Sequence, residues 1–403
     1  MIRPRQAVIL AGGRGTRLGH LTSDRPKPML EIHGRPFLEY LIDMLREQGF
    51  ERVVLLLGYL PDQVVEHFGD GHKFGVDIEY SVTPVEDDTG QRLRLAAPMI
   101  EDVFLLVYCD NYWPIKFDRV WHKYRASDLK AQITVYANDD GYSKDNVRVA
   151  ADGLVQVYDK SRTAPGLKGV EIGFMLLRKQ VLALMPEGNV SFEATVLPAL
   201  VAEGELGAFV TAHRYYSVGS IERLAATTEF LARKPAIFLD RDGVLNKRMP
   251  PATYVRSWSE WEWLPGALDA LRLLKINGYR VILITNQPGV ARGELTLEAL
   301  NHIHATMTAE ARAAGGEIAA IYACVHGWND GCECRKPAPG LFFQAQRDMA
   351  LDLTRTWYAG DDERDEQAAT AAGCPFVMVD NTTSVLDAAK RVIAARSGAG
   401  AHV

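Results

Sequence analysis

The stretch "KPAIFLDRDG", residues 234–243, decides how this chain divides. A Lys-Pro pair ends the helical pattern before it, and the apolar strand that follows ends in two aspartates. Strand-like and helix-like segments alternate on both sides of this stretch, which is typical of parallel sheets covered by helices. A chain of 403 residues is also too long for one ordinary core. We therefore predict an α/β protein with two doubly wound parallel-sheet domains, residues 1–232 and 233–403.

Composition excludes several classes of protein. The formal net charge is −6 and no long basic run is present, so we expect no nucleic-acid partner. No apolar stretch approaches membrane-spanning length, and the N-terminus lacks a signal-peptide pattern. Of the five cysteines, three crowd into residues 324–334, whereas Cys109 and Cys374 stand alone, which argues against a disulfide framework. We expect a cytoplasmic protein without a membrane partner; the pattern does not indicate an oligomeric state.

Polar side chains follow three predicted strands of the second domain. Asp240 and Asp242 come after "AIFL", Thr285 and Asn286 after "RVILI", and Asp361 after "TWYAG". Ligands of open α/β sheets bind at the carboxyl ends of the strands, so these groups should converge. Carboxylates gathered this closely repel one another unless a cation lies among them, and oxygen ligands suit Mg²⁺. The sequence therefore predicts a magnesium site.

The predicted chemistry of this cluster is phosphoryl transfer. One carboxylate can attack phosphorus and form an aspartyl-phosphate, while the second protonates the leaving oxygen and later deprotonates water. Lys336 and the Thr285 hydroxyl could stabilise the phosphoryl oxygens. The alternative is that Asp240 and Asp242 merely cap a turn. The order Thr285, Lys336 and Asp361 behind them favours catalysis.

This region, residues 235–395, resembles the haloacid dehalogenase superfamily of phosphatases. The stretches "DRDGVLN", "TNQPGVARG", "CRKPAPG" and "GDDERDEQAA" are similar to its heptose bisphosphate phosphatase branch. The resemblance implies Asp240 as nucleophile, Asp242 as general acid and base, and Mg²⁺ held at Asp240, Asp361 and the Asp242 carbonyl. The residues that it implies for phosphate and substrate binding are Thr285, Lys336, Asn246, Asn286, Arg292 and Arg335.

A cysteine and histidine cluster lies in the stretch "CVHGWNDGCEC". Cys324, His326, Cys332 and Cys334 supply three thiolates and one imidazole, which form a closed tetrahedral zinc site. Such zinc is structural and would fix the loop before Lys336. The alternative is an accidental cluster of core cysteines, but the glycines and polar residues between them indicate a surface loop.

The first domain begins with a glycine-rich loop, "LAGGRGTRLG", directly after a predicted strand. Backbone N–H groups of such a loop can close around phosphate. Arg17 lies in the loop and Lys27 follows in "RPKPM", so both can neutralise a triphosphate. Asp110 ends the strand "VFLLVYCD" and can hold Mg²⁺. The spacing fits neither the Walker A loop nor the dinucleotide-binding loop.

Residues 5–230 resemble the sugar-1-phosphate nucleotidyltransferases, through "LAGGRGTRLGHLTSDRPKPMLEIHGRPFLEY" and "SFEATVLPALVAEGELGAF". The resemblance implies a Rossmann-like domain in which a sugar 1-phosphate attacks a nucleoside triphosphate, with GTP favoured, and pyrophosphate leaves. Arg17 and Lys27 would bind phosphates, Lys160 the sugar phosphate and Glu171 the sugar. The implied nucleotide contacts are Leu10, Ala11, Gly12, Gly13 and Gly90.

Three positions depart from that family's pattern. Ser217 stands where a second metal-binding aspartate is common, Cys109 replaces a usual glycine, and Glu171 replaces a usual asparagine. A hydroxyl is a weaker Mg²⁺ ligand than a carboxylate. These differences bear on metal affinity, rate and sugar preference.

The two resemblances describe consecutive reactions. A phosphatase that removes the 7-phosphate of a heptose 1,7-bisphosphate leaves a heptose 1-phosphate, which a nucleotidyltransferase can use. The hypothesis is a bifunctional enzyme of nucleotide-heptose synthesis for surface polysaccharide, with sugar phosphates and a nucleoside triphosphate as its small-molecule partners. Two alternatives stay open: a phosphatase whose first domain is a nucleotide-binding regulator or scaffold, and both activities on a different sugar phosphate.

Overall fold

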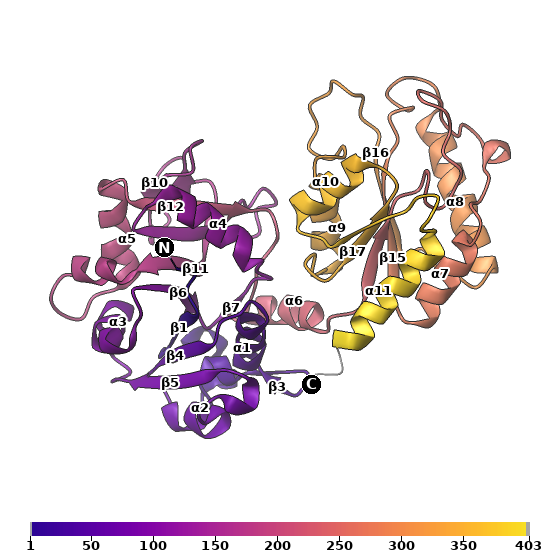
Figure 1. Ribbon diagram of the computed structural model, residues 1–403. Coiled ribbons are helices and arrows are strands. Elements are labelled where there is room, and N and C mark those ends of the chain that lie inside the picture. The colour runs from indigo at the N-terminus through magenta and orange to yellow at the C-terminus, as the bar shows by residue number, and fades with distance from the viewer. Residues whose placement is uncertain (1, 400–403) are drawn as a thin grey trace. The chain divides into compact units, whose positions relative to one another are not determined.

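The structure is a computed structural model that describes residues 2–399. The chain forms two compact units, Met1–Leu231 and Ala232–Val403, and each unit has its own main sheet (Figure 1). The predicted domain boundary lies one residue later, between 232 and 233. Met1 and residues 400–403, the outer ends of the predicted domains, are outside the described residues. Within the described part, no helix has the length and apolar character needed to cross a membrane.

The first unit is built on a seven-stranded sheet. Strand β1 carries the sequence QAVILA and is buried at every position, as expected of a strand covered on both faces. In sheet order the strands are β12 (Leu206–Thr211), β8 (Ala131–Tyr136), β11 (Val170–Arg178), β6 (Val103–Tyr108), β1 (Gln6–Ala11), β4 (Arg52–Leu57) and β5 (Asp77–Val82).

One strand corrects the prediction of a purely parallel first sheet. β11 pairs antiparallel with both of its neighbours, β6 and β8, whereas the other pairs are parallel. Two neighbouring strands run parallel only if a crossover, usually a helix, returns the chain to the end of the sheet at which the first strand began. Residues 137–169, between β8 and β11, contain only the short antiparallel pair β9 (Val147–Val149) and β10 (Val155–Tyr158). The chain therefore enters β11 from the opposite end, and the sheet is mixed.

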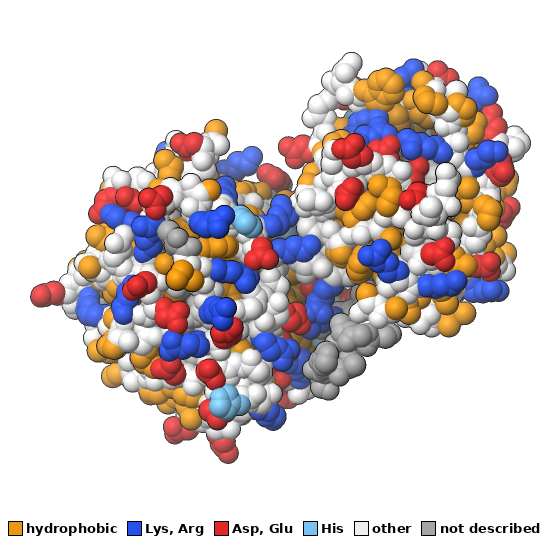
Figure 2. All heavy atoms as spheres, in the orientation of Figure 1, with side chains coloured by type: hydrophobic (Ala, Val, Ile, Leu, Met, Phe, Trp, Pro, Cys, Tyr) orange, Lys and Arg blue, Asp and Glu red, His pale blue; other side chains and the backbone are white. Residues whose placement is uncertain are grey.

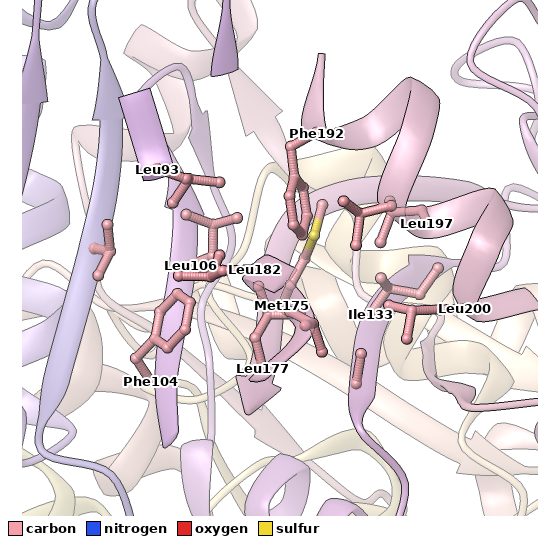
Figure 3. Close-up of a cluster of buried hydrophobic side chains, with 14 of the residues drawn as sticks. Leu93, Phe104, Leu106, Ile133, Met175, Leu177, Leu182, Phe192, Leu197 and Leu200 are labelled. Carbon is pink, nitrogen blue, oxygen red and sulfur yellow. The ribbon is translucent and has the colours of Figure 1, made fainter. Parts of the chain in front are cut away.

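Helices cover this sheet, and a large apolar core lies beneath two of them. Figure 3 shows Phe104 and Leu106 of β6 and Met175 of β11 among the buried side chains that meet Leu93 of α3 and Phe192 of α5. The helices of the first unit are α1 (Phe37–Glu47), α2 (Pro61–Phe68), α3 (Thr89–Ala96), α4 (Phe117–Ser127), α5 (Phe192–Ala202) and α6 (Ile221–Leu231).

The second unit has a five-stranded sheet in which every neighbouring pair is parallel. Its order is β16 (Ala320–Cys324), β15 (Arg280–Asn286), β14 (Ala236–Leu239), β17 (Trp357–Gly360) and β18 (Phe376–Met378). Two hydrophobic clusters pack the sheet against helices. The helices are α7 (Ala267–Ile276), α8 (Leu297–Ala313), α9 (Gly340–Met349), α10 (Glu363–Ala372) and α11 (Val385–Ala399).

Short strand pairs outside the main sheets bring loops together. β7 (Asn111–Tyr112) pairs antiparallel with β13 (Tyr216–Ser217), so that Ser217 lies opposite Asn111. The Val218 amide donates to the Asp110 carbonyl at 2.9 Å and extends this contact. β2 (Glu31–Ile32) and β3 (Arg35–Pro36) form a hairpin. On the face of each unit visible in Figure 2, basic and acidic side chains are intermingled.

Candidate active sites

The second unit gathers polar side chains at the ends of three adjacent strands. Asp240 and Asp242 follow β14, Thr285 and Asn286 end β15, and Asp361 follows β17. All five line one pocket of about 730 Å³. The strands are parallel neighbours, so their carboxyl ends meet at the same edge of the sheet, where ligands of such folds bind. The pocket is therefore the candidate phosphatase site.

Lys336 is a buried cation at the base of this pocket. It is 3% exposed, and its Nζ lies 3.0 Å from Asp240 Oδ2 and 2.7 Å from Asp365 Oδ1. Burial alone would lower the pKa of Lys336, but these two carboxylates hold it above its ordinary value. Asn286 fixes the Lys336 backbone, because its Oδ1 accepts from the Lys336 amide at 3.0 Å and its Nδ2 donates to the carbonyl at 3.1 Å. The charge is thus in place before any substrate arrives.

Asp365 is a member of the site that the sequence analysis missed. It is buried at the start of α10, where it accepts from the Tyr358 hydroxyl at 3.0 Å and the Asp361 amide at 3.1 Å. One feature of the sequence could have indicated it: Asp365 follows Asp361 by four residues, and a helix begins between them. Asp365 thereby supports both Lys336 and the strand end that carries Asp361.

Three carboxylates make a possible cation site. One oxygen from each of Asp240, Asp361 and Asp365 lies within 4.8 Å of the others, and this all-oxygen set suits Mg²⁺. Gly243, at φ 88°, allows the close approach, because a Cβ there would lie 1.9 Å from Asp361 Oδ2. Burial and the neighbouring carboxylates raise the pKa of Asp240 to about 7, against the attraction of Lys336. A divalent cation would favour the ionised carboxylate that nucleophilic attack requires.

The Asp242 carboxylate is held outside this trio. It accepts from Arg241 Nη2 at 3.0 Å, Asn246 Nδ2 at 2.9 Å and Gln287 Nε2 at 2.7 Å. Burial would raise the pKa of Asp242, but the Arg241 charge and these donors hold it below the ordinary value. Asn246, predicted to bind substrate, is fully buried behind Asp242 and does not line the pocket. Asp242 is thus held as a carboxylate, the form that can accept a proton.

Basic side chains surround the mouth of the pocket. Arg248, which the sequence analysis did not single out, donates to Asp361 at 3.0 Å and to Asp362 at 2.9 Å. Arg335 lines the pocket beside Lys336. Arg292 does not line it; its guanidinium stacks on the ring of Trp328, with Cζ 4.9 Å from the ring centroid.

The four predicted zinc ligands lie together in the second unit. Cys324 Sγ is 3.7 Å from Cys332 Sγ and 3.3 Å from Cys334 Sγ, and His326 Nδ1 is 3.1 Å from Cys334 Sγ. A tetrahedral ion with Zn–S bonds of about 2.3 Å places its sulfurs about 3.8 Å apart. None of the five cysteines is in a disulfide, and one donor atom from each of the four residues lies within 4.8 Å of the rest. The donor set fits a closed, structural zinc site.

In the first unit, a second pocket of about 530 Å³ joins residues from distant parts of the sequence. Arg17, Asp110, Lys160, Glu171 and Ser217 all line it. Asp110 follows β6, and the β7–β13 pair brings Ser217 beside it. The candidate sugar phosphate site therefore contains most of the predicted polar residues, including two of the three departures, Glu171 and Ser217.

Lys27 and Asp110 form a close ion pair, with 2.5 Å between Nζ and Oδ2. Lys27 is buried in a short 3-10 helix, Lys27–Met29, directly after Pro26. Both residues were predicted to act on the triphosphate, one directly and one through a metal. In this structure they neutralise each other. Binding of a nucleotide phosphate to Lys27, or of a cation to Asp110, must therefore break this ion pair or add a further partner to it.

The glycine loop rests on a buried arginine. Leu10 and Ala11 are buried at the end of β1, and a Cβ on Gly12 would lie 2.3 Å from Arg92 Cζ. Arg92 Nη1 donates to the Leu57 carbonyl at 2.7 Å, and burial lowers the pKa of Arg92. The sequence analysis did not predict this cation behind the loop.

The predicted nucleotide contacts are not among the residues that line the second pocket. Gly90 is buried against Val190, to whose carbonyl its amide donates at 2.9 Å. Neither Gly90 nor residues 10–13 line the 530 Å³ pocket. The role of these five residues as nucleotide contacts stays a prediction.

Two glutamates of the second pocket differ in protonation. Burial first, and then the nearby Glu193, raise the pKa of Glu171 to about 8, against the Gly173 amide. Burial would also raise the pKa of Glu193, but Lys160, 3.2 Å away, and neighbouring donors hold it below the ordinary value. At neutral pH, Glu171 is a protonated donor and Glu193 a carboxylate, which suits recognition of sugar hydroxyls.

Comparison with known families assigns both units. The sequence profile of the nucleotidyl transferases matches residues 6–231, which is more than half of the chain. The profile described as polynucleotide kinase 3 phosphatase matches residues 234–381. The two matches do not overlap, and each lies within one unit.

Individual relatives are found for each unit. The D-glycero-beta-D-manno-heptose-1,7-bisphosphate 7-phosphatase of Pseudomonas aeruginosa is 38% identical over 143 residues, 36% of this chain and 79% of that protein. The same enzyme of Bordetella bronchiseptica is 44% identical over 138 residues, 34% of this chain and 76% of that protein. A structure of HddC from Yersinia pseudotuberculosis complexed with GMP-PN is 28% identical, covers 56% of this chain and 99% of its own, and has a TM-score of 0.49.

Proposed function

This chain belongs to the nucleotidyl transferases through its first unit and to the heptose-1,7-bisphosphate 7-phosphatases through its second, and we propose that it joins their two reactions in nucleotide-heptose synthesis. It is a bifunctional enzyme, a hydrolase and a transferase. The phosphatase unit removes the 7-phosphate of heptose 1,7-bisphosphate. The transferase unit then joins the heptose 1-phosphate to a nucleotide, for which the sequence resemblance implies GTP.

The observation that carries the phosphatase proposal is the buried contact between Asp240 and Lys336 at the end of three parallel strands. Asp240 attacks phosphorus, the bond to the sugar oxygen breaks, and an aspartyl-phosphate forms. Lys336 and the Thr285 hydroxyl stabilise the phosphoryl oxygens. Mg²⁺ held by Asp240, Asp361 and Asp365, with the Asp242 carbonyl as a further ligand, would offset the charge repulsion between nucleophile and phosphate.

Asp242 completes the turnover as the proton carrier. Held ionised by Arg241, Asn246 and Gln287, it accepts a proton from the water that hydrolyses the aspartyl-phosphate. We propose that the leaving sugar oxygen takes up a proton relayed from solvent through Asp242, and that the proton Asp242 later accepts from water returns to solvent. Over one cycle the ester and one water become the sugar hydroxyl and phosphate.

The transferase unit needs no covalent intermediate. An oxygen of the sugar 1-phosphate attacks the α-phosphorus of the nucleoside triphosphate, and pyrophosphate leaves. Arg17 and Lys27 would bind the phosphates, and Asp110 would hold Mg²⁺ once its pair with Lys27 opens. Lys160 and Glu171 in the second pocket would bind the sugar phosphate. Catalysis is then positioning and charge neutralisation.

Pyrophosphate release tests the transferase half. The purified chain is mixed with heptose 1-phosphate and each of the four nucleoside triphosphates in turn, with Mg²⁺ present. We expect pyrophosphate with GTP and a much slower reaction with the other three. Pyrophosphate with another triphosphate would correct the base, whereas none with any of them would leave a phosphatase with a nucleotide-binding module.

One observation favours that second candidate function. Asp110 is already neutralised by Lys27, and Ser217 gives the pocket a hydroxyl where a second carboxylate is common in the family. A unit of this kind could bind a nucleotide without turning it over. Calorimetry with GTP and Mg²⁺ separates the two: a regulator binds GTP but releases no pyrophosphate when heptose 1-phosphate is added.

A further inference from the structure

The phosphatase pocket is larger than the phosphate that Asp240 accepts. Its volume of about 730 Å³ extends from the strand ends to the loop of residues 327–331 and to a facing segment, residues 247–255. With phosphate at Lys336, the rest of the substrate must lie between these two segments. The side chains there determine which substrates fit.

Trp328 is the large apolar side chain that the 327–331 loop presents to this space. It lines the pocket and is 61% exposed, which is unusual for a tryptophan. The loop itself is well fixed. Cys324 and His326 before the loop lie against Cys332 and Cys334 after it, and the Gly327 amide donates to Asp330 Oδ2 at 2.7 Å.

Arg292 packs on the Trp328 ring instead of on a carboxylate. Its Cζ lies 4.9 Å from the ring centroid, and the ion pairs found among residues 2–399 do not include Arg292. It does not line the pocket. A guanidinium over an indole face is a favourable contact that restricts the ring. Arg292 therefore reaches the substrate space only through Trp328.

We propose that Trp328 is a specificity-determining contact that stacks on the sugar ring of the phosphatase substrate, and that Arg292 is a positioning residue acting through Trp328. The inference rests on the proposed phosphatase function. It adds the residue by which the enzyme would prefer sugar phosphates over small phosphate esters that have no ring. Sugar rings present C–H faces, and a flat aromatic surface held in one orientation buries such a face at low entropic cost.

The test compares a ring substrate with a substrate that has none. Phosphate release is measured for the wild-type chain, Trp328→Ala and Trp328→Leu on heptose 1,7-bisphosphate and on glycerol phosphate. Leu297→Ala, which removes another exposed apolar side chain of this unit outside the pocket, is the matched control. We expect Trp328→Ala to raise KM for the bisphosphate about tenfold, about 1.4 kcal/mol, with kcat and the glycerol phosphate reaction unchanged.

The Trp328→Leu variant controls for a loss of loop structure in Trp328→Ala. It keeps an apolar side chain in the loop but removes the flat ring, so KM for the bisphosphate should still rise severalfold. An unchanged KM in both variants, or an equal loss on both substrates, would overturn the proposal. If the wild type does not hydrolyse the bisphosphate, the proposed substrate is wrong. The same comparison on the sugar phosphate that it hydrolyses fastest then tests Trp328 independently.

A double-mutant cycle tests the role of Arg292. Arg292→Met alone should raise KM for the bisphosphate about threefold, because the ring loses its support. In the Trp328→Ala background the same change should have no further effect. If Arg292→Met costs as much without the tryptophan as with it, Arg292 contacts the substrate directly and the positioning role is refuted.

Discussion

The two pockets neutralise phosphate in different ways. In the second unit, Lys336 is buried between Asp240 and Asp365, so nucleophile and cation are fixed by the fold. In the first unit, the strand-end carboxylate Asp110 is paired with Lys27, which must be shared with or released to a ligand. Covalent catalysis requires one carboxylate in one place, whereas nucleotidyl transfer depends on several charges that position the reactants.

The largest expected effect is on the covalent step. Asp240→Asn should reduce phosphate release by a factor on the order of 10⁴ or more, because the amide cannot form the aspartyl-phosphate. Pyrophosphate release by the same protein should be unchanged. Asp269→Asn, at an exposed carboxylate of the same unit, is the matched control. Loss of both activities in a folded Asp240→Asn protein would contradict separate sites.

The corresponding change in the first unit should have a smaller effect. Lys27→Met should slow pyrophosphate release about 10²- to 10³-fold, since one phosphate-binding charge is lost while the others remain. It also frees Asp110, so the Mg²⁺ concentration needed for half-maximal rate should fall. Exposed Lys73 provides the control variant Lys73→Met. A rate within twofold of wild type would remove Lys27 from the transferase mechanism.

Removing a ligand from the Cys and His cluster should change the stability and activity of the second unit alone. With Cys334→Ser we expect loss of bound zinc and a lower unfolding temperature of the second unit by about 5–10 °C. Phosphate release should fall about tenfold, because the loop that precedes Lys336 loses its anchor. Metal analysis and calorimetry measure the first two effects. Wild-type protein that contains no zinc, with an unfolding temperature insensitive to chelators, would be incompatible with this site.

The smallest expected effect is a pH dependence at Glu171. Its pKa of about 8 means that the carboxyl donates a hydrogen bond below pH 8 and becomes an anion above it. KM for the sugar 1-phosphate should therefore rise severalfold between pH 7 and pH 9, and Glu171→Gln should abolish the rise. The folded state also binds this proton more tightly, so its contribution to stability is lost as pH increases toward 8. An identical pH profile in Glu171→Gln would exclude this role.

The sequence predicts best what depends on neighbouring residues. Apolar strands that end in aspartates mark the carboxyl edge of a sheet, and the structure brings Asp240, Asp361 and Lys336 together there. The roles assigned to these residues stay predictions. The first sheet was mispredicted as purely parallel, because the direction of β11 depends on the absence of a helix between residues 137 and 169. Local apolar patterning is the same for parallel and antiparallel buried strands.

Contacts between side chains that are far apart in the sequence could not be predicted either. Arg92 lies 80 residues from the glycine loop that it supports, and its position in a helix gives no sign of this contact. Arg241 separates two predicted catalytic aspartates, yet only the fold shows that it holds one of them. Arg292 was predicted from a family motif as a substrate contact, and the structure places it on Trp328. Such roles arise from packing, which spacing alone does not encode.

The central claim is that one chain carries two separate sites whose reactions follow each other. The most direct test supplies heptose 1,7-bisphosphate, GTP and Mg²⁺ to the purified protein and measures phosphate, pyrophosphate and nucleotide-heptose by mass. We predict that all three products form, with one pyrophosphate for each nucleotide-heptose and at least as much phosphate. Phosphate release that leaves GTP intact while heptose 1-phosphate accumulates would contradict the claim.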